Sequence, residues 1–374
     1  MQKVYFKSSC LNNRTKAVIF GKKGLIRHVR TPQYDADNNH YLIDFDSKTH
    51  KSLCFYKGYI DKTSKVFPGK ISIGVEYKYC NTKKQNLTYL YSQTITKTGR
   101  VENYILEDSK NLSYRKDNSK KISIFIPDSY DSTTPYDILY FFDAQNLFSN
   151  AGIYTQNGDP YGSWQLDIVL SEIYRQYGKG IIVVGIDNAD VYRSQELFMN
   201  PDNFGDLSML GKNIPNDNFS VGYLDELSSF IIETLHPFVK AKYYVSENNI
   251  GIGGSSMGGI AAFYCGIREI GFYKYILSYS PAYGLYKMSA FDNFFGRFEF
   301  TKNQEILPKV HIYCGAGDPL EKMLLPSAKN MKRLMIKHGY PEKHIFETYD
   351  HKKPHNEESW RLILPESFSL LLDL

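Results

Sequence analysis

The sequence has few residues of the kinds that hold metals or disulfides. Its five cysteines are an odd number, and no two of them have the Cys-x-x-Cys spacing. Neither a disulfide framework nor a structural zinc site is therefore indicated. His351 and His355 are four residues apart, but Pro354 interrupts any helix there and the glutamate of a His-Glu-x-x-His motif is missing. We expect no metal and no cofactor.

Long apolar segments are also missing. No run of 18 apolar residues occurs, and the N-terminal MQKVYFKSSC has no apolar signal-peptide core. The 45 Lys and Arg nearly balance the 40 Asp and Glu, which does not indicate a nucleic-acid binder. A basic cluster from Arg14 to Arg30 is interrupted by apolar Ala17–Phe20, which is typical of a solvated hairpin face. We expect a cytoplasmic protein without a membrane or nucleic-acid partner, and a homo-oligomer stays open.

The 374 residues divide into two parts with different patterns. In residues 1–115, short Val, Ile, Phe and Tyr runs alternate with turn residues, which predicts a small all-β domain of the immunoglobulin-like sandwich type. In residues 116–374, strand-like runs alternate with helical ones, which predicts an α/β domain whose mostly parallel sheet is covered by helices on both faces. Asp187–Gly222 is long and polar, which indicates either a substrate-side loop or lid, or a surface insertion.

Several segments are specific enough to be predicted as single elements. The strands expected in the first part are Val4–Phe6, Ala17–Phe20, Tyr41–Phe45, Ser52–Tyr56, Ile71–Tyr79, Leu87–Tyr91 and Tyr104–Leu106. Those expected in the second part are Lys121–Ile126, Asp137–Phe142, Gly180–Ile186, Asn249–Gly253, Tyr275–Tyr279, Lys309–Cys314 and Ile345–Tyr349. Helices are expected at Trp164–Tyr177, Tyr223–Val239, Met257–Arg268, Leu320–His338 and Asn356–Leu372.

One segment has the pattern of a nucleophile elbow. Gly254-Ser255-Ser256-Met257-Gly258 follows a predicted strand and precedes a predicted helix. A serine on such a tight turn projects its hydroxyl above the sheet, and glycines allow the close backbone packing. Met257 opens the helix, so its N–H is expected to point at a developing oxyanion. Ser255 is one residue too early for the motif, and a purely structural or phosphate-binding glycine turn is the other interpretation.

An acid and a base should follow the serine, in that order. Asp318 comes directly after the predicted strand Lys309–Cys314 and a glycine turn, and Glu321 is the alternative acid. Asp318 also has the position of an N-cap for the helix that begins near Pro319, which is the competing structural interpretation. The histidine is either His351 or His355, both of which follow the last predicted strand.

Five segments together resemble one known family. They are Tyr140–Phe148, Gly162–Asp167, Ile181–Asn188 with Arg193 and Glu196 after it, Gly254–Gly259 and His355–Trp360. From about residue 120 onward the chain resembles the putative-esterase group of α/β hydrolases, which includes ferric-enterobactin esterases, S-formylglutathione hydrolases and feruloyl or acetyl-xylan esterases. The resemblance implies an α/β-hydrolase fold and hydrolysis of carboxylic esters.

The resemblance also implies roles for individual residues. The triad would be Ser256, Asp318 and His355. The turn at Asp143 would supply the second oxyanion N–H, from Ala144 or Gln145, with Ala144 in place of the usual glycine. Trp164, Arg193 and Asn146 would bind substrate. A small ester, for example a siderophore lactone, is the expected substrate; acetyl or feruloyl polysaccharide esters, or a non-catalytic binding module, are the alternatives.

Overall fold

The structure, a computed structural model, describes residues 2–6, 15–20, 26–30, 33–35, 40–45, 52–57, 89–96, 98–148, 163–189, 192–199, 222–302 and 304–372. Nine strands form its central sheet, in the order β15-β14-β13-β12-β10-β11-β9-β8-β7. Their bounds are β7 (Tyr89–Ile95), β8 (Gly99–Glu107), β9 (Ser119–Pro127), β10 (Tyr136–Phe142), β11 (Ile181–Ile186), β12 (Val245–Ser255), β13 (Tyr275–Tyr279), β14 (Lys309–Gly315) and β15 (Ile345–Asp350).

The sheet is parallel from β15 to β11 and antiparallel beyond it. Neighbouring strands from β15 through β11 pair in parallel, and β9, β8 and β7 then alternate in direction. The parallel strands β10 and β11 are buried along their whole length, as their continuous apolar sequences predict. The mostly parallel α/β sheet is therefore confirmed, and the antiparallel direction of β9 is a feature that the strand pattern did not reveal.

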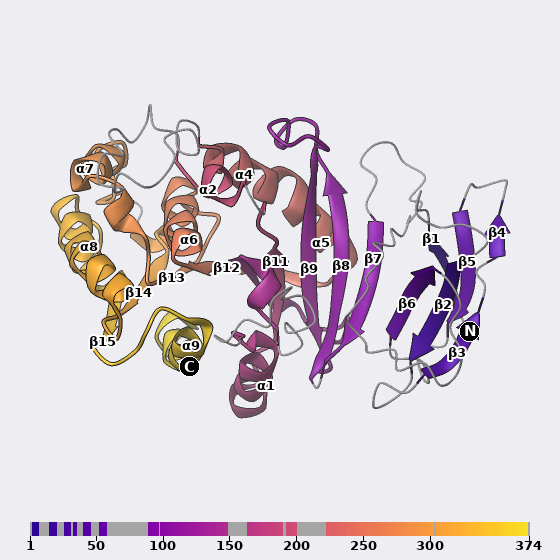
Figure 1. The fold of residues 1–374 in the computed structure, drawn as a ribbon. Coiled ribbons are helices and arrows are strands. Elements are labelled where there is room, and N and C mark those ends of the chain that lie inside the picture. The colour runs from indigo at the N-terminus through magenta and orange to yellow at the C-terminus, as the bar shows by residue number, and fades with distance from the viewer. Residues whose placement is uncertain are drawn as a thin grey trace.

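Helices cover both faces of this sheet (Figure 1). Their bounds are α1 (Leu166–Tyr177), α2 (Arg193–Glu196), α4 (Leu224–Phe230), the π-helical η6 (Ile231–Leu235), α5 (His236–Lys242), α6 (Met257–Arg268), α7 (Met288–Phe295), α8 (Pro319–Lys337) and α9 (Glu357–Leu372). Helices α1 and α9 pack on one face, where they share an apolar cluster with the sheet. Helices α4 to α8 pack on the other. Helix α7 had not been predicted from the sequence.

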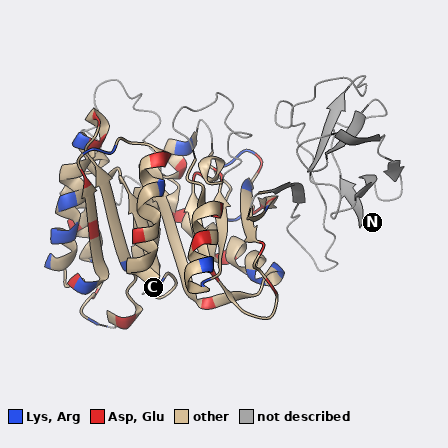
Figure 2. Ribbon diagram, turned by 90° about the horizontal axis from the view of Figure 1, so that it is seen from below, with Lys and Arg blue, Asp and Glu red and all other residues tan. Residues whose placement is uncertain are grey.

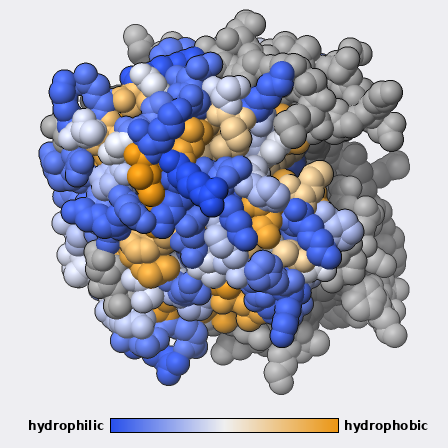
Figure 3. Space-filling view, turned by 90° about the vertical axis from the view of Figure 1, so that its left-hand side faces the viewer, coloured by the Kyte–Doolittle hydropathy of each residue, from blue (hydrophilic) through white to orange (hydrophobic). Residues whose placement is uncertain are grey.

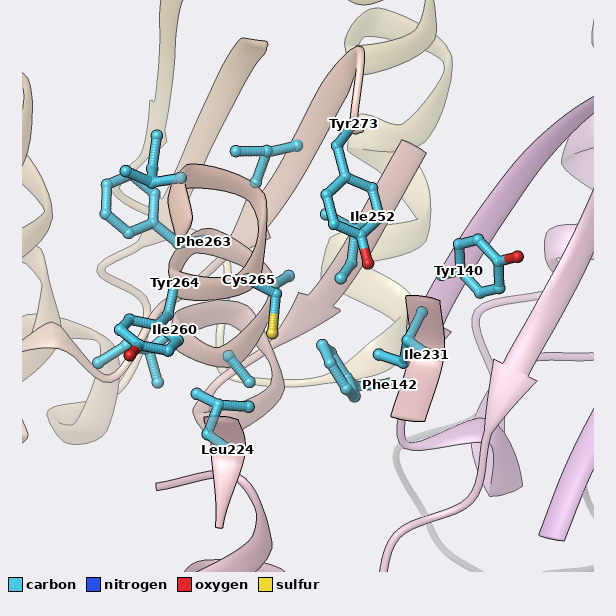
Figure 4. Packing of buried hydrophobic residues seen from close by; sticks show 14 of the residues in the cluster. Tyr140, Phe142, Leu224, Ile231, Ile252, Ile260, Phe263, Tyr264, Cys265 and Tyr273 are labelled. Carbon is cyan, nitrogen blue, oxygen red and sulfur yellow. The ribbon is translucent and has the colours of Figure 1, made fainter. Parts of the chain in front are cut away.

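Helix α6 begins directly after the candidate nucleophile Ser256 and is buried along most of its length. Ten of its residues, from Gly258 to Ile267, are buried. Figure 4 shows Cys265 of this helix facing Ile252 of β12 and Phe142 of β10, while Phe263 lies on the opposite side of the helix. Each such apolar side chain contributes roughly 1.5–3 kcal/mol when it leaves water. This packing fixes the start of α6 against the carboxyl ends of β10 and β12.

The N-terminal strands form two separate three-stranded sheets, ordered β1-β5-β4 and β3-β2-β6. Their bounds are β1 (Gln2–Phe6), β2 (Thr15–Phe20), β3 (Ile26–Arg30), β4 (Gln33–Asp35), β5 (His40–Phe45) and β6 (Ser52–Lys57). The strand predicted at Ile71–Tyr79 lies outside the described residues. The immunoglobulin-like sandwich stays a prediction.

Strands β7 and β8 lie on the N-terminal side of the predicted boundary at residue 115 but belong to the central sheet. β8 pairs with β9 along its whole length, from Gly99 opposite Pro127 to Glu107 opposite Ser119. Its buried Val101, Tyr104 and Leu106 join the core of the α/β domain. The sequence-based assignment of these two runs to the N-terminal domain therefore differs from their pairing, because strand patterns do not identify the partner strand.

The outer side of α7 and α8 is strongly polar. Basic residues recur along α8 in Figure 2, and Figure 3 shows a largely hydrophilic face with isolated apolar side chains. Lys322, Lys329 and Lys337 of α8 are exposed, while Leu324, Met331 and Met335 of the same helix are buried. This alternation is that of an amphipathic surface helix. Among the described residues, no helix has the length and hydropathy needed to span a bilayer.

Candidate active site

Ser256 occupies the junction between β12 and α6. Its backbone has φ 57° and ψ −120°, a conformation that a non-glycine residue rarely adopts. The turn is held by its N–H, which donates to the Tyr279 carbonyl at 2.9 Å, and by its carbonyl, which accepts from the Ala282 N–H at 3.0 Å. A strained residue kept in place by its surroundings is typical of a functional site. The strand–turn–helix context expected for Ser256 is present.

Two glycines make this junction possible. A Cβ on Gly254 would lie 2.4 Å from the carbonyl oxygen of Gly258, so the strand and the helix can approach only without that side chain. A Cβ on Gly258 would lie 2.9 Å from a carboxylate oxygen of Asp143. The first turn of α6 is therefore packed directly against the end of β10.

His355 contacts a carboxylate, and that carboxylate belongs to Glu321. The distance from His355 Nδ1 to Glu321 Oε1 is 2.9 Å, and the Glu321 side chain is fully buried. Because an ionised carboxylate only accepts hydrogen bonds, this contact places the proton of a neutral imidazole on Nδ1. Nε2 is then left as the basic nitrogen.

Asp318 has the N-cap position, which was the competing interpretation of the sequence, and not the position beside the imidazole that the triad assignment required. Its Oδ1 accepts from the Glu321 N–H at 2.9 Å, which makes it the N-cap of α8, and its Oδ2 accepts from the His355 N–H at 2.6 Å. The structure therefore places Asp318 against the backbone of His355 and Glu321 against its imidazole. The reason is the helix start: a capping side chain turns back onto its own helix, while a residue on the first turn can reach outward.

Several donors surround the Glu321 carboxylate. Its Oε2 accepts from the Gly315 N–H at 2.9 Å and lies 3.1 Å from Cys314 Sγ. Burial by itself raises the pKa of this carboxyl, but hydrogen bonds from His355, Ser280 and Cys314 outweigh burial and hold the pKa below its usual value. Glu321 is therefore charged at neutral pH. Burial and the adjacent carboxylate raise the pKa of the Cys314 thiol, so it stays protonated and acts as a donor.

The turn after β10 contains Asp143, Ala144 and Gln145. Positive φ falls on Asp143, at 58°, while Ala144 begins the short 3-10 helix η2 (Ala144–Asn146). An alanine is therefore compatible with the second position, because the left-handed conformation is adopted by the residue before it. The Gln145 side chain also contacts Asp143, and its buried Oε1 has no partner among the described residues.

Arg193 binds the carboxylate of Asp143 with two nitrogens. Nε donates to Oδ1 at 2.6 Å and Nη2 donates to Oδ2 at 2.7 Å. Burial would raise the pKa of the Asp143 carboxyl, yet the charge of Arg193 and hydrogen bonds from Arg193, Asn188 and Gln145 lower it. Arg193 was predicted to bind substrate. The structure shows it bound to Asp143 at the edge of the pocket, and a contact with substrate stays a prediction.

A buried ion pair anchors α2, which carries Arg193. Glu196 at the end of this helix pairs with Lys120 of β9, and both side chains are about 1% exposed. Arg115 and Tyr114 also donate to Glu196, at 3.2 Å and 2.9 Å. Burial outweighs this pairing and lowers the pKa of Lys120. The segment predicted as a loop or lid thus contains a fixed helical turn at residues 193–196. Residues 190–191 and 200–221 lie outside the described part.

Ser256 and His355 share one pocket of about 260 Å³. Most of its wall is polar, and its lining residues are Asp143, Gln145, Asn146, Trp164, Arg193, Ser255, Ser256, His355, Glu357 and Trp360. All three predicted substrate-binding residues are in this lining. Asn146 Nδ2 donates to Glu357 Oε1 at 3.0 Å, which joins the turn after β10 to the start of α9.

The apolar part of the wall consists of two tryptophans. Trp164 and Trp360 stack at 5.4 Å with an interplanar angle of 26°. The sequence alone did not reveal roles for Trp360, Glu357, Cys314 or Ser280. In the sequence, Trp360 stood out only as the last residue of the family-like segment His355–Trp360. Ser280 directly follows a buried strand, and this position could have predicted that it lies at the edge of the sheet. Within the described residues, no group of three or more His, Cys, Asp and Glu could hold a metal ion.

Comparisons with solved structures agree with this fold. An IroE-like serine hydrolase from Shewanella oneidensis has 14% identity and a TM-score of 0.55, with 71% of this chain and 78% of that chain covered. The BES protein from Bacillus cereus has 13% identity and a TM-score of 0.50, with 78% and 99% covered. The siderophore hydrolase EstA from Aspergillus nidulans has 16% identity and a TM-score of 0.50, with 71% and 94% covered.

These structures share the fold of this chain, and the family is shown by a separate comparison. No curated protein sequence matches the chain significantly. The family model described as "Putative esterase" matches residues 113–371, which is more than half of the 374 residues. The chain therefore belongs to the putative esterase family and is a carboxylic ester hydrolase.

Proposed function

We propose that the chain is a serine esterase in which Ser256 is the nucleophile, His355 the general base and Glu321 the acid that orients it. One observation carries this proposal: the strained Ser256 opens into the same pocket as an imidazole whose Nδ1 is bound to a buried carboxylate. That combination is the arrangement that activates a serine hydroxyl.

The proposed reaction proceeds through an acyl-enzyme. Ser256 Oγ attacks the ester carbonyl carbon while its proton moves to Nε2 of His355, and the carbonyl oxygen becomes an oxyanion. The C–O bond to the alcohol then breaks, and the departing oxygen takes the proton from Nε2. A water molecule repeats the sequence on the acyl-enzyme and releases the acid. The charge of Glu321 stabilises the imidazolium in both halves.

Two backbone N–H groups are suited to the oxyanion. Met257 is the first residue of α6, so its N–H has no carbonyl partner within the helix. The second donor is the N–H of Ala144 or Gln145, at the start of η2, since the Asp143 carboxylate packs against Gly258 and brings the two segments together. Each such donor contributes about a hundredfold or more to the rate.

The polar wall of the pocket favours a small, oxygen-rich ester over a long aliphatic one. Five of the lining side chains can donate or accept hydrogen bonds without taking part in the proposed proton transfer: Asp143, Gln145, Asn146, Arg193 and Glu357. A siderophore-type lactone is one ester of this kind. The stacked tryptophans favour the second candidate substrate, an aromatic acyl ester such as a feruloyl ester.

The proposal is tested on Ser256→Ala with p-nitrophenyl acetate. We expect hydrolysis to fall by about a thousandfold or more, because the nucleophile is removed while the fold is kept. A fluorophosphonate probe should label the wild-type chain at Ser256 and leave Ser256→Ala unlabelled, with Ser255→Ala as the matched control. Full hydrolysis by Ser256→Ala would contradict the serine mechanism, and a folded wild-type chain that never labels would favour a binding module.

A further inference from the structure

The imidazole, the acid and one tryptophan are joined by a further serine. Ser280 follows β13 with φ 40°, is fully buried, and donates its N–H to the Tyr313 carbonyl at 2.6 Å. Its Oγ accepts from the Trp360 Nε1–H at 2.8 Å. Its hydroxyl is also one of the groups whose hydrogen bonds lower the pKa of the Glu321 carboxyl.

The chemistry of the indole decides the direction of this hydrogen-bond chain. An indole N–H can only donate, so Ser280 must be the acceptor in its contact with Trp360. The single hydroxyl proton of Ser280 is then free to turn toward the carboxylate, which can only accept. The contact with Trp360 therefore leaves the Ser280 hydroxyl proton available to the Glu321 carboxylate.

A contact between the rings of Trp360 and His355 completes this network. The edge of one ring faces the other in the His355–Trp360 pair, with centroids 4.9 Å apart and an interplanar angle of 85°. Trp360 is 4% exposed, and Trp164 stacks on it. Trp360 thus contacts the imidazole directly and reaches the acid through Ser280. Trp360 of α9 therefore holds both partners of the hydrogen bond between His355 Nδ1 and Glu321.

We propose that Trp360 and Ser280 are positioning residues of this esterase, which fix the orientation of His355 and limit how strongly Glu321 attracts the imidazole proton. The proposal rests on the proposed function of Ser256, His355 and Glu321. A hydrogen bond donated to the carboxylate disperses part of its charge, so less of that charge acts on the imidazolium. The indole contact meanwhile prevents the imidazole from rotating out of line with Ser256.

The test uses the full chain with Trp360→Phe and Ser280→Gly. Phenylalanine keeps an aromatic ring but lacks the N–H, and glycine adopts a positive φ without strain while it removes the hydroxyl. We expect the acid limb of the kcat/KM profile for p-nitrophenyl acetate to move to higher pH by roughly half a unit in both variants, the size that one hydrogen bond produces. Since both variants interrupt the same series of hydrogen bonds, the acid limb of the double variant should shift no further than that of either single variant.

A second readout does not depend on a substrate. The Nδ1 proton of His355 should give a downfield proton NMR signal, identified by its loss in His355→Gln, and this signal should move further downfield in both variants. Leu362→Gln, an exposed position on the same helix, is the control. Thermal unfolding identifies any variant that fails to fold, in which case the other variant decides.

The outcomes separate this inference from the proposed function. An unmoved acid limb and an unmoved NMR signal in a folded variant would overturn the positioning role, even if Ser256→Ala is inactive. Shifts that add in the double variant would also overturn it, because they would show two independent packing effects. If Ser256→Ala keeps full activity, the proposed function fails, and the NMR signal still tests the contact network.

Discussion

At the residue scale, two carboxylates three positions apart, Asp318 and Glu321, hold His355 in place. Asp318 and Glu321 begin α8 with the spacing of a capping box, in which the first residue caps the N–H of the fourth. The sequence showed this pattern, and it also showed that both residues follow a strand that leads to the site. It could not show which carboxylate meets the imidazole, since that depends on the path of residues 351–355 over the start of the helix.

The matched pair Glu321→Gln and Asp318→Asn separates the two roles. We expect Glu321→Gln to lower kcat/KM by on the order of a thousandfold, because the amide no longer compensates the imidazolium charge. Asp318→Asn keeps an acceptor for the cap, so we expect activity within about tenfold of the wild type. The amide nitrogen cannot accept the His355 N–H as Oδ2 does, and we expect this lost hydrogen bond to cost about 1 kcal/mol in unfolding free energy. The measurements are hydrolysis of p-nitrophenyl acetate and urea unfolding. A larger loss of activity in Asp318→Asn would return Asp318 to the role first predicted from the sequence.

At the element scale, hydrophobic periodicity predicted most of the α/β elements. Helix α6 begins and ends where it was expected, and β13 does as well, because a glycine turn and a buried apolar run define their ends. Helix α7 was missed, since its eight residues make little more than two turns, too few to give a clear helical period in the sequence. The sequence did not reveal which strands pair. The pattern of β8 is that of any amphipathic strand, and its neighbour is defined only in the folded sheet.

The short helix α2 gives a prediction at this scale. It connects the end of β10 to β9 through Arg193–Asp143 and Glu196–Lys120. We expect Arg193→Met to lower kcat by about tenfold or more, because an uncompensated, half-buried carboxylate would remain beside the proposed oxyanion donors. Asp143→Asn in the same chain should restore part of that loss. A variant in which only KM rises, without coupling to Asp143→Asn in the double-mutant cycle, would instead show that Arg193 contacts the substrate.

At the scale of the whole molecule, the unit that carries the site is larger than the sequence indicated. Ser256, His355 and Glu321 all lie beyond residue 116, and the family match begins at residue 113. The sheet that holds them nevertheless extends back to Tyr89 through β7 and β8. Without β8, the strand β9 would become an edge with unpaired backbone N–H and C=O groups. Its fully buried Ile122, Ile124 and Phe125 would also lose neighbours from β8.

Two truncated chains test this extent of the domain. Residues 89–374 keep every strand of the central sheet. We therefore expect a folded, soluble protein whose kcat/KM for p-nitrophenyl acetate is within about twofold of that of the full chain. Residues 116–374 remove β7 and β8, and we expect aggregation or a clear loss of thermal stability, since exposed apolar edge strands pair with other chains. Gel filtration, circular dichroism and kcat/KM provide the readouts. If residues 116–374 were as stable and active as residues 89–374, the two added strands would be an appendage of the sheet, and the boundary first predicted at residue 115 would describe the catalytic unit better than the pairing of β8 with β9 does.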